Sequence, residues 1–138
     1  MVIVTRGGIV PGGILAEALG VNDILTALVR FPSIDADHKL LAWPEFVQFP
    51  HDDILVGKRI LVVDDVWASG RTITSVKDRI LAAKGLTKLC VLHFNPNRSL
   101  FGETQPDYYG AVTDAHIVYP WEIDCDAEFA LHEPDVVN

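Results

Sequence analysis

One stretch of the sequence, KRILVVDDVWASGRTIT at residues 58–74, constrains the fold more than any other. Residues 59–63 are mainly aliphatic and β-branched, like the buried strands of parallel sheets. Two carboxylates, Asp64 and Asp65, follow where such a strand is expected to end, and like charges side by side repel each other. Because ligands bind at the carboxyl ends of parallel strands, we expect a ligand to compensate these acids.

Strand and helix patterns alternate along the chain. Strands are expected at residues 1–4, 23–29, 59–63, 88–94 and 115–121, and helices at residues 11–19 and 71–84. This alternation predicts an α/β fold, with a mostly parallel twisted sheet flanked by helices. The 138 residues are enough for a single domain with one core.

Both expected helices carry apolar residues at helical spacing and are followed by a glycine, Gly20 or Gly85. We expect the following residues to form their apolar faces: Ile14, Leu15, Ala18 and Leu19 in the first helix, and Ile73, Val76, Ile80 and Ala83 in the second. Residues 33–53 show only weak periodicity and are predicted to be a loop, functional or mobile. Residues 95–110 are predicted to be a second loop.

Composition excludes several classes of protein. The net charge is −8, and no Lys or Arg follows Arg98, which argues against a nucleic-acid partner. No apolar run approaches the roughly 18 residues of a membrane span. The two cysteines, Cys90 and Cys125, have no metal-ligand spacing, and Cys90 is predicted to be a buried free thiol. We therefore expect a cytoplasmic protein.

The turn after the acids has the features of a phosphate site. Ala68 and Gly70 let an anion approach the backbone closely, and Ser69 and Thr72 supply hydroxyl donors. The following helix presents free N–H groups and the positive end of its dipole. Asp64 and Asp65 would then face a hydrogen-bond donor such as a ribose diol, with Mg²⁺ offsetting their charge.

Other known phosphate-binding motifs do not account for this stretch. Neither GxxxxGK[ST] nor GxGxxG occurs in the sequence. The run RILVVDD is also similar to the first strand of response-regulator receiver domains, which hold Mg²⁺ with paired acids. Only 73 residues follow Asp65, which is short of the domain a receiver needs. By itself, TRGG at residues 5–8 is also compatible with a plain tight turn.

Three motifs together resemble the type I phosphoribosyltransferase family. ILVVDDVWASGRT is similar to the family's signature for phosphoribosyl pyrophosphate (PRPP), and VTRGGIVPGGILAEALG resembles its pyrophosphate loop and following helix. DAHIVYPWEID resembles the C-terminal hood of the xanthine-guanine and hypoxanthine branch. The motifs come in the family's order and cover most of the chain except its middle loop. The resemblance implies one domain over residues 1–138, with a core at about 1–98 and a hood at about 99–138.

The resemblance also implies roles for individual residues. Asp64 and Asp65 would be the catalytic acids, holding the ribose hydroxyls of PRPP and, through PRPP, Mg²⁺. The 5′-phosphate would lie on Ala68, Ser69, Gly70, Arg71 and Thr72, and the pyrophosphate on Thr5, Arg6, Gly7 and Gly8. Family members often have a cis peptide at the position of Thr5–Arg6. The implied reaction transfers the phosphoribosyl group of PRPP to a purine or purine-like base and releases pyrophosphate.

Base recognition is where the sequence departs from the family pattern. Asn95 stands where the family uses a lysine to recognise the 6-oxo group, and His116 stands where an aromatic stacks on the purine. With the backbone of Ile117, these two are the predicted base-binding residues. Ala68 occupies the place of an aspartate that acts on the base. The family's N-terminal helix has no counterpart ahead of the first strand.

These departures leave a second hypothesis open. The chain could be a PRPP- or nucleotide-binding regulatory or accessory protein of the same fold, without transferase turnover. In either case a homodimer is expected. Trp67 is expected either to cover the ribose or to fill the core, and Tyr119 and Trp121 to pack the hood. His93 shows no ligand spacing and is predicted to be structural or exposed.

Overall fold

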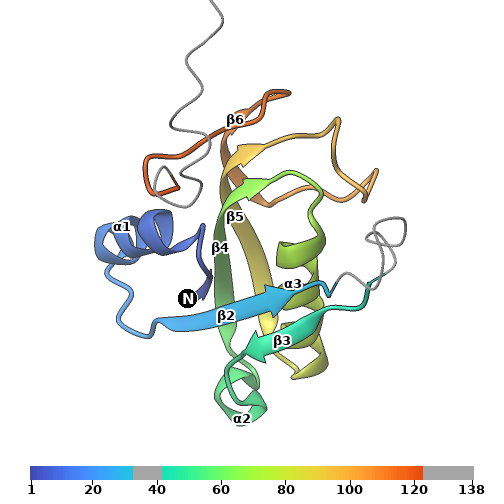
Figure 1. Cartoon of the computed structure of the whole chain (residues 1–138). Coiled ribbons are helices and arrows are strands. Elements are labelled where there is room, and N and C mark those ends of the chain that lie inside the picture. The colour runs from blue at the N-terminus through green and yellow to red at the C-terminus, as the bar shows by residue number, and fades with distance from the viewer. Residues whose placement is uncertain (33–41, 123–138) are drawn as a thin grey trace, which may run out of the picture.

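A computed structural model describes residues 1–32 and 42–122 and forms a six-stranded sheet in the order β3-β2-β1-β4-β5-β6 (Figure 1). The strands are β1 (Val2–Val4), β2 (Leu25–Arg30), β3 (Glu45–Gln48), β4 (Arg59–Trp67), β5 (Leu86–Phe94) and β6 (Tyr108–Val112). The helices are α1 (Ile9–Leu19), α2 (Asp52–Leu55) and α3 (Arg71–Ala82). All neighbouring strands are parallel except β2 and β3. The predicted mostly parallel α/β sheet is confirmed.

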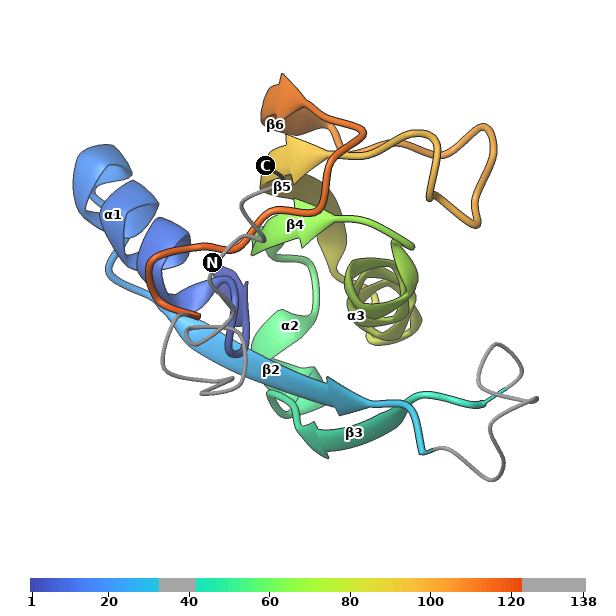
Figure 2. The same cartoon turned by 45° about the horizontal axis from the view of Figure 1, so that its top comes forward.

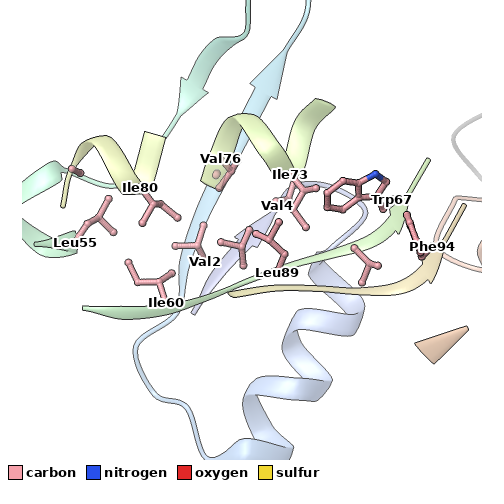
Figure 3. Packing of buried hydrophobic residues seen from close by; sticks show 14 residues of the cluster. Val2, Val4, Leu55, Ile60, Trp67, Ile73, Val76, Ile80, Leu89 and Phe94 are labelled. Atoms are coloured by element: carbon pink, nitrogen blue, oxygen red, sulfur yellow. The ribbon is translucent and has the colours of Figure 1, made fainter. Parts of the chain in front are cut away.

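The main hydrophobic core lies between α3 and one face of the sheet (Figure 3). Ile73, Val76 and Ile80 of α3 are buried, as is Ala83 just after it, so the predicted face of this helix is confirmed. They pack with side chains from the central strands, among them Val62 of β4. Helical spacing indicated the buried face correctly because α3 is strongly amphipathic.

Helix α1 lies on the other side of the sheet from α3 (Figure 2), and the prediction of its buried face is wrong. Ile14 is 66% exposed, Leu19 is 60% exposed and Ala18 is also exposed. The helix instead buries Pro11, Gly12 and Ala16 against the sheet. Small residues let α1 lie close to the strands, and this close approach displaces the larger aliphatic side chains to the outer face.

Three boundaries in the middle and last part of the chain also differ from prediction. Residues 115–121 form no strand; the sixth strand is β6, partly inside the predicted loop 95–110. The predicted loop 33–53 contains β3 and the start of α2, while residues 33–41 lie outside the described residues. Both missed strands are at sheet edges and expose most of their side chains, so they lack an apolar run in the sequence.

Strand β4 continues past the predicted end at Val63 to Trp67, so Asp64 and Asp65 lie within the strand. Cys90 is a free thiol but is half-buried, not buried as predicted, and desolvation raises its pKa. Cys125 and the hood beyond residue 122 lie outside the described residues. Within the two described stretches, no helix has both the length and the apolar composition to cross a bilayer.

Candidate active site

Two loops leave the carboxyl edge of the sheet from adjacent strands. β1 runs into residues 5–8 ahead of α1, and β4 runs into residues 68–70 ahead of α3. Because β1 and β4 pair in parallel, through Val2 with Val62 and Ile3 with Val63, the two loops start from the same edge of the sheet. The sheet topology therefore brings the predicted pyrophosphate loop next to the predicted catalytic acids.

The first loop directly contacts one of these acids. A β-carbon placed on Gly7 would overlap the carboxylate of Asp65. The Thr5–Arg6 peptide is cis, as the resemblance implied. The backbone N–H and the hydroxyl of Thr5 both donate to the carbonyl of Ala27 on β2, at 2.8 and 3.3 Å. Thr5 thus fixes the loop to the sheet, while Arg6 is exposed and available to an anion.

The two acids sit in different surroundings because neighbouring strand residues point to opposite faces. Asp65 faces Gly7. Asp64 comes two residues after the core residue Val62, so alternation assigns it to the face that packs against α3. Both are buried, and Asp64 accepts a hydrogen bond from the backbone N–H of Asp65 at 2.9 Å. Desolvation, and then the charge of Asp65, raise the pKa of Asp64 well above its usual value. Burial also raises the pKa of Asp65, although its hydrogen bond from Trp121 opposes the shift. A bound cation or donor would relieve both penalties.

The second loop is shaped around an aromatic side chain. Gly70 immediately precedes α3 and has φ +79°, in the left-handed region that favours glycine. A β-carbon there would also overlap the indole of Trp67. Trp67 is fully buried and donates its Nε1–H to Ser99 Oγ at 3.1 Å. It therefore fills the core, which decides between the two roles expected for it.

The remaining residues of this loop are tied to other segments. The Ser69 carbonyl accepts from the N–H of Leu100 at 3.1 Å, so the loop after β5 supports it. The Arg71 guanidinium donates to the Ala42 carbonyl at 2.7 Å and stacks over Phe31 at 4.1 Å. The Arg71 side chain thus contacts residues on both sides of the middle segment. Its backbone N–H, at the first position of α3, donates to Ser69 Oγ at 3.4 Å.

The predicted base-binding residues are placed less favourably. Asn95 is buried, and its Oδ1 accepts from the N–H groups of Asn97 and Arg98 at 3.1 and 3.2 Å. Its oxygen therefore stabilises its own turn, and only its amide nitrogen could face a base. His116 is exposed and Ile117 is half-buried, on the segment that leads from β6 to Tyr119.

Three residues without an assigned site role in the sequence analysis contact Asp65 directly or indirectly. The Tyr119 hydroxyl donates to the Asp65 carbonyl at 3.1 Å and lies 2.8 Å from His93 Nδ1. Trp121 donates its Nε1–H to Asp65 Oδ2 at 3.3 Å. Trp121 also lines a pocket of about 430 Å³ with Arg6 and Gly7. Aromatic residues with polar ends just after His116 were the available signal for this cluster.

Comparison with known proteins agrees with this arrangement. The sequence model of the phosphoribosyl transferase domain family matches residues 2–127 of this chain. A xanthine-guanine phosphoribosyltransferase of Ruegeria sp. (strain TM1040) is 31% identical over 129 residues, 89% of this chain and 68% of the relative. Another, from Vibrio atlanticus (strain LGP32), is 36% identical over 81 residues, 59% of this chain and 48% of that relative.

A solved structure gives the same result for the fold. The crystal structure of a purine phosphoribosyltransferase from Pyrococcus horikoshii Ot3 superposes with a TM-score of 0.74 at 30% identity, over 87% of this chain and 75% of that one. The sequence alignments with the two curated relatives span about two thirds of the Ruegeria protein and about half of the Vibrio protein. The resemblance noted in the sequence is confirmed, and the chain belongs to the phosphoribosyltransferase family, in the branch of the purine enzymes.

Proposed function

We propose that this chain transfers the 5-phosphoribosyl group of PRPP to a purine or purine-like base and releases pyrophosphate. The observation that carries the proposal is the contact between Gly7 and the Asp65 carboxylate. It sets a loop suited to a diphosphate against an acid suited to a sugar diol, close to a helix N-terminus suited to a phosphate. PRPP carries these three groups on one ribose. The xanthine-guanine relatives support the choice of a purine.

Each part of the site then has a task. The backbone of residues 5–8 and the exposed Arg6 would hold the pyrophosphate. The N–H groups and hydroxyls of residues 68–72 would hold the 5′-phosphate. Asp64 and Asp65 would accept hydrogen bonds from the ribose hydroxyls, which would favour their ionised forms.

The reaction breaks the bond between C1 of the ribose and pyrophosphate, and the electron pair leaves with the pyrophosphate. A ring nitrogen of the base supplies the pair for the new bond to C1, and the base loses one N–H proton to the leaving pyrophosphate or to water. Positive charge develops on the sugar in between, so the buried carboxylates would stabilise it at low cost in reorganisation. Trp121 and Glu122 line the pocket beside Arg6 and help to exclude water from it.

A magnesium ion fits this site only together with substrate. The two carboxylates supply the oxygen ligands that Mg²⁺ prefers. Within the described stretches, however, no three His, Cys, Asp or Glu side chains are grouped as a metal site. Asp64 and Asp65 would therefore hold the ion indirectly, through PRPP and water. When bound, it would offset the charge of the leaving diphosphate.

The base would bind beside the segment that carries His116 and Ile117. His116 would stack on the ring, Ile117 would offer its backbone groups, and Asn95 would present its amide nitrogen. As a neutral donor, Asn95 would select for a 6-oxo group less strongly than a lysine does. This arrangement favours a broad range of purines.

We also propose a homodimer that works in the cytoplasm, on small-molecule substrates and without nucleic acid. The outer face of α1 exposes Ile14 and Leu19, and Leu15 and Leu19 border an apolar groove of about 820 Å³ against β4 and β5. A second copy of the chain would cover this surface. The free thiol of Cys90 would stay reduced in the cytoplasm.

The experiment is pyrophosphate release from PRPP and Mg²⁺ with guanine, xanthine, hypoxanthine, adenine or orotate. We expect release with at least one purine and none with orotate. Asp65→Asn should lower the rate at least roughly a hundredfold, because it removes a charge that acts on the transition state. Asp53→Asn, at an exposed position on α2, is the matched control and should leave the rate unchanged. Stabilisation by PRPP without release with any base would contradict the proposal.

A further inference from the structure

We propose that Tyr119 is a positioning residue for Asp65. Its hydroxyl lies between His93 and the Asp65 carbonyl and would hold the sugar-binding carboxylate in place. The position of Asp65 would then depend on the contacts made by residues 119–122. This inference rests on the proposed function, since it concerns how the same site binds PRPP.

The first support is a chain of hydrogen bonds that joins three elements. Tyr119 is 4% exposed, and its hydroxyl donates to the Asp65 carbonyl at 3.1 Å. A tyrosine hydroxyl has one proton, so the 2.8 Å contact with His93 Nδ1 requires the histidine to donate to the tyrosine oxygen. His93 on β5 therefore orients the hydroxyl towards β4, and Asp65 and Tyr119 are joined although 54 residues separate them.

The second support is the place where this contact is made. β4 and β5 pair residue by residue from Arg59 to Asp64, and the pairing resumes at Val66 with His93. Asp65 is thus the residue of described β4 at which this ladder lapses. Its other neighbour, β1, pairs with β4 only at Val62 and Val63. The Tyr119 hydroxyl takes a carbonyl at the point where backbone support is weakest, so its loss would free Asp65 to move.

The third support is that the same segment contacts the Asp65 carboxylate. The ring of Trp121 stacks on that of Tyr119, with centroids 4.7 Å apart and planes at 10°. From there Trp121 Nε1–H donates to Asp65 Oδ2. The Tyr119 carbonyl accepts from the N–H of Glu122 at 2.9 Å, and the Glu122 carboxylate accepts from the N–H of Tyr119 at 3.0 Å. This closed turn, with Pro120 inside it, gives Tyr119 and Trp121 a fixed relative position.

The segment therefore holds Asp65 from two sides, through its carbonyl and through one carboxylate oxygen. A carboxylate can accept about four hydrogen bonds, so Trp121 leaves acceptor sites for the ribose. The contacts of this segment would align Asp65 before PRPP arrives. PRPP binding would then not have to supply the free energy needed to order the Asp65 side chain.

The test compares Tyr119→Phe, which keeps the ring and its stack, with Tyr108→Phe, a tyrosine 56% exposed on β6. We expect Tyr119→Phe to raise the Kd of PRPP–Mg²⁺ in calorimetry, and its KM, roughly three- to tenfold. The KM of the purine should change less than about twofold. Tyr108→Phe should change neither value. A merely structural role for Tyr119 would lower the thermal midpoint and leave the PRPP values unchanged, and would overturn the proposal.

His93 supplies a second measurement that does not depend on the tyrosine variant. His93→Phe should weaken PRPP binding as Tyr119→Phe does, because it removes the donor that orients the hydroxyl. His93→Asn should restore binding to within about twofold, because its amide can donate in place of Nδ1. When Tyr119→Phe and His93→Phe are combined, the two fold-losses in PRPP affinity should not multiply, because both substitutions disrupt the same hydrogen-bonded unit. Losses that multiply, or an asparagine that restores nothing, would overturn the proposal.

The outcomes separate this inference from the proposed function. If the wild-type chain binds PRPP but releases no pyrophosphate, the proposed transfer fails while the calorimetric Kd values still decide the role of Tyr119. If it transfers and the variants bind normally, only the inference fails. If it does not bind PRPP at all, both fail.

Discussion

The two faces of the sheet are built on different principles. On the α3 face, large side chains of an amphipathic helix interdigitate with those of the central strands, and the core is continuous from Leu55 to Trp67 (Figure 3). On the α1 face, the helix buries only Pro11, Gly12 and Ala16, and its aliphatic side chains point away. The first face mainly supplies stability, whereas the second brings a backbone loop close to an acid.

This difference explains where each face tolerates change. On the α3 face, the free energy of unfolding depends on side-chain volume, which substitutions can alter gradually. On the α1 face it depends on backbone-to-backbone distance, where a single added carbon has no room. Four predictions would break or sharpen the comparison.

Truncation of the α3 core should have the largest effect on stability. Ile80→Ala should lower the free energy of unfolding by about 3–4 kcal/mol, because Ile80 is fully buried and the change leaves a cavity. Urea denaturation measures this loss. Leu81→Ala on the same helix is the control, since Leu81 is 44% exposed, and should cost under about 1 kcal/mol. Equal losses from both would mean that α3 does not pack as described.

A β-carbon at Gly8 should have the next largest effect. It would lie 2.5 Å from the Val63 carbonyl oxygen and 2.6 Å from that of Val4, and backbone atoms cannot rotate away. Gly8→Ala should therefore cost about 2–3 kcal/mol. At Gly13, inside α1, an added β-carbon meets nothing within 4 Å, so Gly13→Ala should be neutral or stabilising by about 0.5–1 kcal/mol. A tolerated Gly8→Ala would show that α1 can move away from the sheet.

The third prediction concerns Asp64, whose burial should lower the stability of the folded chain in exchange for a role in PRPP binding. Its raised pKa means that the folded chain resists its ionisation, so its carboxyl stabilises the fold fully only below the unfolded pKa and loses this contribution as pH rises through the folded value. Asp64→Asn should thus raise stability without ligand by about 1–2 kcal/mol at pH 7, with little gain at pH 3.5. Thermal scans at both pH values measure the gain in stability, and PRPP binding measures the affinity that the variant loses. A loss of stability at pH 7 would contradict the burial of this charge.

The outer face of α1 should show the smallest effect on the fold itself. Ile14→Ser should change the free energy of unfolding of the monomer by under about 0.5 kcal/mol, because Ile14 is 66% exposed. If this face is the proposed dimer surface, the same variant should shift sedimentation towards the monomer. A large loss of stability in a chain that is already monomeric would mean that α1 packs on Ile14 after all.

The sequence predicted the α3 side of the molecule well and the α1 side poorly, for a physical reason. Periodicity reports which residues a helix would bury against large neighbours, and Ile73, Val76 and Ile80 do this. It does not report close approach by small residues, so Ala16 was missed. The two loops proposed to bind the pyrophosphate and the 5′-phosphate could be located in the sequence, the first from the family resemblance and the second from residue types suited to an anion, and both lie at the carboxyl edge of the sheet.

The cluster around Asp65 could not be predicted in the same way. The contact between Tyr119 and His93 depends on where the segment after β6 crosses the sheet, and no local pattern encodes that crossing. Edge strand β6 has no buried side chain to mark it, so the strand was placed several residues too late. Long-range contacts of this kind become visible only once the topology is known.

The overlap of Gly70 and Trp67 has a consequence for how this site can vary. The indole occupies the volume that any side chain at position 70 would need, so the two positions behave as one unit. A smaller residue at 67 would open a hole beneath the bend, while a larger one at 70 would expel the ring from the interior. The shape of the bend is thus set by the ring packed beneath it and does not depend on a bound ligand.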